Sequence, residues 1–161
     1  MKKVFILFVL FFAFLHNQPA FAQSKKNAQK EFLQQLNTVL KKSLRHESGY
    51  EGKMLIDTPF AINREGLLCV TLRYTNDSTY QRVRLEAPVK DIRTVRYDLY
   101  LILEYGDDLV TKYESEWGSA ALKEVSRGSW FHVGAPLPED VTYQQKVQQA
   151  LDKLKKFKSI E

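Results

Sequence analysis

Two glutamates and one histidine come closest, by residue type and spacing, to catalytic chemistry. Glu114 and Glu116 fall on one face of a predicted strand, about 6.8 Å apart at 3.4 Å per residue. An inverting glycosidase uses two carboxyl groups at such a separation as acid and base. Lys112 projects from the same face, and this pattern equally fits a solvated charged surface. His132 stands among aromatic residues, and one hypothesis is a small envelope hydrolase that uses His132 or the Glu114/Glu116 pair.

Metal, thiol and phosphate chemistry have little support in the sequence. His46-Glu47 begins like a zinc-protease motif, but position 50 is Tyr, so the second histidine at helical spacing is missing. Cys69 is the single cysteine; we expect it to be buried, although strand alternation puts it on the more polar face. There is no Gly-x-Ser-x-Gly motif and no phosphate-binding glycine loop. We therefore expect no catalytic motif, no metal and no cofactor.

Aromatic side chains favour a binding role. Tyr and Trp offer a large contact area with a polar tip, and they are enriched where proteins bind other molecules. The ligand-contact candidates lie near predicted strand ends and in a late loop: Tyr97, Tyr100, Trp117, Trp130 and His132. The leading hypothesis is an exported, non-enzymatic binding or interaction protein of the cell envelope, with an unknown protein or small ligand as its partner.

The charge distribution suggests a third hypothesis. The chain carries 24 basic and 19 acidic side chains, a net charge of +5, and residues 23–161 keep 22 and 19, a net charge of +3 that is too mild to indicate nucleic-acid binding. Four basic residues follow one edge of the first predicted helix of the domain: Lys26, Lys30, Lys41 and Arg45. Such an edge suits an anionic surface, whereas basic helices also complement an acidic sheet and keep a protein in solution.

The N-terminus has the pattern of a secretory signal peptide. Two lysines precede an apolar run from Val4 to Leu15, which spans about 18 Å as a helix and is too short for a bilayer core. Ala20-Phe21-Ala22 then fits a signal peptidase, so we expect residues 1–22 to be removed after Ala22. The product, 23–161, is expected to be one soluble, non-membrane-spanning domain, periplasmic or secreted, with its oligomeric state open.

Two amphipathic helices frame this predicted domain. From 27 to 45, apolar residues recur at steps of three and four, which indicates a helix with one buried face. A second such segment follows Asp140, a suitable N-cap just after two prolines.

Between the helices, β-branched and aromatic runs alternate with turn residues. We predict strands near 53–62, 67–76, 79–88, 94–105, 109–117 and 128–133, all antiparallel because the connections are too short for helical crossovers. Side-chain parity aligns Leu72 with Val83, and it favours a hairpin in which Tyr105 pairs with Leu109. The predicted fold is α+β: an N-terminal amphipathic helix, an antiparallel meander of about six strands, and a C-terminal helix packed on the sheet.

Overall fold

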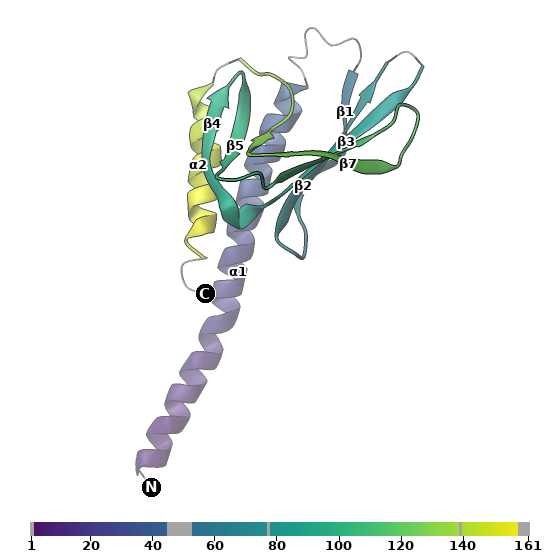
Figure 1. Cartoon of the computed structure of the whole chain (residues 1–161). Helices are drawn as coiled ribbons and strands as arrows, with labels where there is room; N and C mark the ends of the chain where they lie inside the picture. Colours follow the sequence, from purple (N-terminus) through teal and green to yellow (C-terminus); the bar gives the residue numbers. More distant parts are fainter. Residues whose placement is uncertain (1, 45–52, 77, 139, 158–161) are drawn as a thin grey trace.

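The computed structural model describes residues 2–44, 53–76, 78–138 and 140–157, those before Gln23 by their backbone only. Within these residues, two helices and eight antiparallel strands in two sheets form an α+β fold (Figure 1). The elements are α1 (Lys2–Ser43), β1 (Lys53–Ile62), β2 (Leu67–Thr75), β3 (Tyr80–Pro88), the 3-10 turn η1 (Val89–Asp91), β4 (Ile92–Asp98), β5 (Tyr100–Tyr105), β6 (Val110–Ser115), β7 (Leu122–Gly128), β8 (Trp130–His132) and α2 (Val141–Lys155). The predicted fold class is confirmed.

The two helices pack side by side, and their apolar stripes form the centre of the core (Figure 1). The stripe of α1 is fully or almost fully buried and repeats at helical spacing: Ala28, Phe32, Leu36, Val39 and Leu40. In α2 the matching residues are Val147, Ala150, Leu151 and Leu154. The Asp140 side chain accepts a hydrogen bond from the Thr142 backbone N–H at 2.9 Å, so the predicted N-cap is confirmed.

Helix α1 is longer than the amphipathic segment that the sequence predicts. It begins at Lys2, and its N-terminal part extends away from the sheets and from α2 (Figure 1). Within the described part of the chain, no helix combines the length and the apolar character needed to cross a membrane.

The larger sheet has the strand order β1-β2-β3-β6-β7. The β2–β3 register matches the parity prediction, with Leu72 opposite Val83 and Leu68 opposite Ala87. The residues on this face, Leu68, Val70 and Ala87, belong to the same buried cluster as the α1 stripe. One face of the sheet therefore closes the core.

The smaller sheet, β4-β5-β8, corrects the predicted hairpin. The segment expected as one strand, 94–105, is two strands that fold back on each other at Leu99, whose φ is +58°. Consequently β5 pairs with β4 and β8, while β6 pairs with β3 and β7, so the predicted pairing of Tyr105 with Leu109 is wrong. The residues that join the core cluster are odd-numbered on both sides of Leu99, with Val95 before it and Leu101 and Leu103 after it. Alternation therefore cannot distinguish one long strand from this hairpin.

Strand β7 is a second difference from the prediction. Its side chains are exposed along most of its length at the edge of the larger sheet, so it lacks the apolar alternation that marks a strand. It leads into β8 through Ser129, whose carbonyl accepts a hydrogen bond from the Tyr105 N–H at 2.8 Å. The chain thus crosses from the larger sheet to the smaller one over a single residue.

Side chains from both helices form hydrogen bonds with backbone N–H and carbonyl groups of the strands. The Asn37 amide of α1 donates to the Phe60 carbonyl at 3.1 Å and accepts from the Phe60 N–H at 2.8 Å. From α2, Gln148 accepts from the Val95 N–H at 2.8 Å, and Gln144 donates to the Val95 carbonyl at 3.0 Å. These bonds fix β1 to α1 and cover the exposed edge of β4.

After β8 the chain approaches the end of α1 closely at Gly134. Its φ is +83°, and an added Cβ would lie 2.2 Å from the Ser43 hydroxyl and 3.0 Å from Leu40. The Ser43 Oγ, fully buried, accepts a hydrogen bond from the Ala135 N–H at 3.1 Å and donates to the Leu40 carbonyl at 2.8 Å. Only glycine satisfies both the backbone conformation and this contact.

We expect Gly134→Ala to lower the free energy of unfolding by about 2–4 kcal/mol, because the methyl group adds strain and displaces a buried hydroxyl. Urea denaturation followed by circular dichroism measures it. Gly128→Ala is the matched control: it has no neighbour within 4 Å of an added Cβ and should change stability by less than about 1 kcal/mol. Equal effects of the two substitutions would contradict this account.

Candidate functional site

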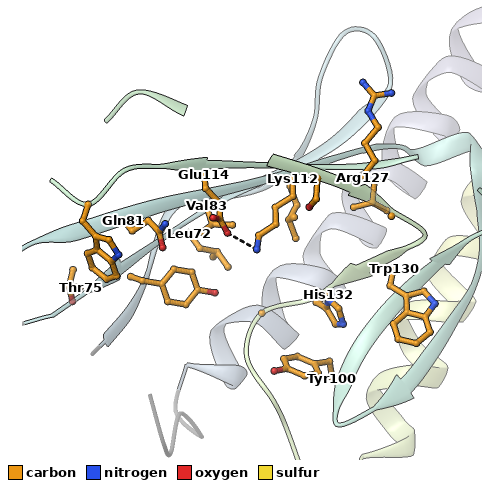
Figure 2. Close-up of a pocket in the computed structure, with 17 residues that line it drawn as sticks. Leu72, Thr75, Gln81, Val83, Tyr100, Lys112, Glu114, Arg127, Trp130 and His132 are labelled. Atoms are coloured by element: carbon orange, nitrogen blue, oxygen red, sulfur yellow. Dashed lines mark ion pairs between the residues drawn. The ribbon is translucent and has the colours of Figure 1, made fainter. Parts of the chain in front are cut away.

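A groove of about 620 Å³ lies between the two sheets (Figure 2). One wall is the face of the larger sheet that also closes the core, and the other is the outward face of the smaller sheet. Aliphatic side chains of β2, β3 and β6 line its apolar part: Leu72, Val83, Leu85 and Val110. Pockets of this size hold small organic ligands or short polymers.

The groove exists because the apolar face of the larger sheet continues past the core. Along β2, Leu68 and Val70 are fully covered, Leu72 is 5% exposed and Tyr74 is only partly buried. Across the sheet, Leu72 pairs with Val83, which in turn pairs with Glu114. The wall therefore changes from apolar to charged on passing from β2 to β6.

The smaller sheet contributes an aromatic cluster. Tyr100 of β5 and Trp130 and His132 of β8 project from the same face of that sheet toward the groove (Figure 2). The His132 ring meets the Tyr100 ring edge-on at 4.8 Å between centroids and the Trp130 ring at 6.5 Å. Such tilted contacts fix ring orientation and contribute about 0.5–1.5 kcal/mol each.

Charges in the groove are balanced. The Lys112 Nζ lies 2.6 Å from the Glu114 carboxylate, and both side chains are partly exposed (Figure 2). Burial, and secondarily the positive charge of Lys112, lowers the pKa of His132 below its ordinary value, so the imidazole is neutral at pH 7. Arg127 borders the groove, but its guanidinium is turned out of it (Figure 2). Its Nε lies 2.9 Å from the Glu124 carboxylate.

No family model, curated protein or solved structure matches the chain. What the groove can do must therefore be argued from its own residues. It offers aliphatic and aromatic surface together with one donor–acceptor pair, which is the composition of a binding site for a molecule with apolar faces and polar edges.

Four of the five aromatic candidates line this groove: Tyr100, Trp117, Trp130 and His132. Tyr97 does not. It stands on the opposite face of the smaller sheet, and its hydroxyl donates a hydrogen bond to the Leu137 carbonyl. This bond holds the segment after β8 against the β4–β5 hairpin, so Tyr97 has a structural role.

The structure does not bring Glu114 and Glu116 together in the groove. Strand β6 ends at Ser115, whose hydroxyl accepts a hydrogen bond from the Arg82 N–H, so Glu116 no longer follows the alternation of the strand. Glu116 is 79% exposed in its side chain and binds Lys123 at 2.9 Å, whereas Glu114 lines the groove. The carboxylate pair that the sequence suggested is thus divided between two environments.

Sequence reasoning missed the aliphatic wall as part of a site. Side-chain parity predicts that Leu72 lies opposite Val83, and both are on the apolar face of the β2–β3 hairpin together with Leu85. The alternating pattern identified the face. It did not show that the helices leave part of that face uncovered, because this depends on the lengths of elements distant in sequence.

Cys69 lies on the opposite face from the groove and is buried, as expected. Its Sγ lies 3.6 Å from both the Glu86 carboxylate and the Leu67 carbonyl, either of which can accept its single S–H hydrogen. Burial, followed by the charge of Glu86, raises the pKa of the Cys69 thiol, the reverse of what a nucleophile requires. Among the described residues, no group of three or more His, Cys, Asp or Glu side chains could hold a metal; the His46-Glu47 segment lies outside them.

Of the basic edge, Lys26, Lys30 and Lys41 are exposed on α1, and Arg45 lies outside the described residues. The neighbouring Lys42 is engaged with α2: its Nζ lies 3.7 Å from Asp140 and 4.3 Å from the centroid of the Tyr143 ring.

We expect the His132 imidazole to titrate below 6.5 in the folded protein and closer to 6.5 when unfolded. Because the folded state then binds the proton less tightly, His132 makes the protein less stable as the pH falls from 7 through the folded pKa. NMR titration of the His132 Cε1–H signal, with and without urea, measures both values. A folded pKa at or above the unfolded one, or a stability-versus-pH curve that His132→Gln leaves unchanged, would contradict this.

Proposed function

We propose that the chain is an exported, non-enzymatic binding protein whose ligand occupies the groove between the two sheets. The observation that carries this proposal is that two tryptophans, Trp117 in the turn after β6 and Trp130 in β8, line one groove while remaining 50% and 53% exposed. Large aromatic surface left open to water commonly marks a place where another molecule binds.

The groove walls support the same proposal. Leu72, Val83 and Leu85 supply aliphatic surface, and the ring contacts of His132 hold Tyr100 and Trp130 in fixed orientations. A preorganised site of this kind binds with little loss of side-chain entropy.

A hydrolase remains the alternative for this groove because Glu114 and His132 both line it. Against that role, Lys112 engages Glu114 at 2.6 Å, and Glu116 lies outside the groove. Product formation from a bound ligand that is lost in both Glu114→Gln and His132→Gln would favour the hydrolase.

The third hypothesis, an electrostatic surface binder, depends on the exposed Lys26, Lys30 and Lys41 of α1. It differs from groove binding in its salt dependence. Adsorption to anionic vesicles that weakens with added salt and is insensitive to Trp117 and Trp130 would favour it.

Export through removal of residues 1–22 is part of the proposal, and the packing of α1 is compatible with it. The described α1 side chains that the core buries begin at Ala28, six residues after the proposed cleavage site. Cleavage after Ala22 would therefore leave the amphipathic stripe of α1 whole.

Expression of the full chain in a Gram-negative host with a functional secretion system should yield a product that begins at Gln23. Intact mass spectrometry of the exported fraction measures this directly. Replacing Ala20 and Ala22 with Asp should block cleavage, because the peptidase requires small residues there. A full-length mass in the exported fraction would contradict the proposal.

Groove binding can be tested with the tryptophans themselves, because the chain has two and both line the groove. A metabolite library screened by tryptophan emission should contain ligands that shift the spectrum, and Trp130→Ala should weaken their binding at least tenfold, about 1.4 kcal/mol.

Val125→Ala is the matched control, since Val125 is 51% exposed on β7 and does not line the groove. Its ligand affinities should equal those of the unsubstituted protein. If the ligands bind the unsubstituted protein, Trp130→Ala and Val125→Ala with equal affinity, they bind outside the groove, and the proposal that the groove is the binding site is refuted.

A further inference from the structure

We infer that the ligand of this groove is an uncharged oligosaccharide of two or three pyranose rings. This inference rests on the proposed function and specifies its ligand. Three features of the groove carry it: the placement of the two tryptophans, the composition of the polar groups between them, and the size of the cavity.

The tryptophans stand toward opposite ends of the groove. Trp117 directly precedes Gly118, whose N–H donates to the carbonyl of Tyr80, the partner of Thr75, at 2.8 Å, so Trp117 lies near Thr75 and Gln81. Figure 2 shows Thr75 and Gln81 at one end of the groove. Trp130 lies at the other end, beside His132 and Tyr100 (Figure 2). An extended ligand can therefore contact one indole with each of its ends.

Exposed indoles of this kind suit sugar rings. A pyranose has weakly polar C–H faces and a rim of hydroxyl groups, so it can cover a flat aromatic ring and still direct its hydroxyls outward. Trp117 and Trp130 are half exposed, which leaves ring surface for such contact while the remainder packs against the protein.

The polar groups between the tryptophans match hydroxyls better than they match an ionic headgroup. Lys112 supplies N–H donors and Glu114 supplies carboxylate acceptors, and together they carry no net charge. Gln81 adds an amide oxygen at the Trp117 end, while its Nε2 donates to the Ser115 carbonyl at 3.1 Å. Sugar hydroxyls both donate and accept, so one ring can bond to Lys112 and Glu114 without separating them.

An anionic amphiphile fits these groups less well. Its headgroup would have to compete with Glu114 for Lys112, and Arg127 is turned away and bound to Glu124 (Figure 2). The carboxylate left without its partner would then repel the ligand. Charge complementarity therefore favours an uncharged occupant.

The volume of the groove sets the length of the oligosaccharide that it can hold. About 620 Å³ lies in the middle of the range of pockets that enclose drug-sized molecules, and two or three pyranose rings are of that size. The groove would thus hold two or three rings of a sugar chain.

The test titrates the purified chain with cellotriose, maltotriose and chitotriose, and separately with laurate as the anionic amphiphile, following tryptophan emission and binding heat. At least one trisaccharide should bind, with a heat signal and a shift of the emission maximum. Trp117→Ala and Trp130→Ala should each weaken this binding at least tenfold, and Val125→Ala should not change it. A Lys112→Met/Glu114→Gln double variant, which removes both charges together, should also weaken trisaccharide binding.

Three results would overturn the inference. Absence of binding by all three trisaccharides up to about 10 mM would do so, since that limit excludes even a weak specific site. Laurate binding that depends on both tryptophans, without trisaccharide binding, would leave the proposed function standing and refute the sugar. Trisaccharide binding that neither tryptophan variant weakens would refute both, because the sugar would then bind outside the groove.

Discussion

The apolar face of the larger sheet is longer than the helical stripe available to cover it, and the rest of the architecture follows from that mismatch. Phe32, Leu36 and Leu40 of α1 bury one end of the face together with Leu68 and Val70. The smaller sheet then rests on the helices with its own apolar side inward and presents its outer side to the uncovered remainder. Two sheets that do not pair with each other thereby enclose a groove between them.

This arrangement places core residues and groove residues within the same strands. In β2, Leu68 belongs to the core and Tyr74 to the groove, only six residues apart on the same face. In the smaller sheet the division runs between faces: Leu103 and Phe131 are fully buried on one side, while Tyr100 and His132 line the groove on the other. Exposed groove side chains such as Trp130 can therefore change without loss of the buried cluster, whereas Leu72 and Val110 belong to both the groove and the core.

The sequence predicted those parts of the structure that depend on local periodicity. The stripes of α1 and α2, the Asp140 cap and the β2–β3 register are all set by residues a few positions apart. The pairing of β5 with β4, in place of the predicted hairpin between β5 and β6, was not predictable in this way. Leu99 belongs to no residue type that marks a turn, and it leaves the alternation unbroken. For the same reason the aromatic candidates could be named from their strand positions, whereas their meeting with Leu72 and Glu114 across two sheets could not.

A single residue, Ser129, joins β7 of the larger sheet to β8 of the smaller sheet. Gly128 and Trp130, on either side of Ser129, both line the cavity, and Ser129 is tied to the smaller sheet through the Tyr105 N–H. The distance between the two walls of the groove thus depends on the length of this one-residue connection. An insertion or deletion there would change the distance between the two walls, so the width of the groove depends on the length of this crossover.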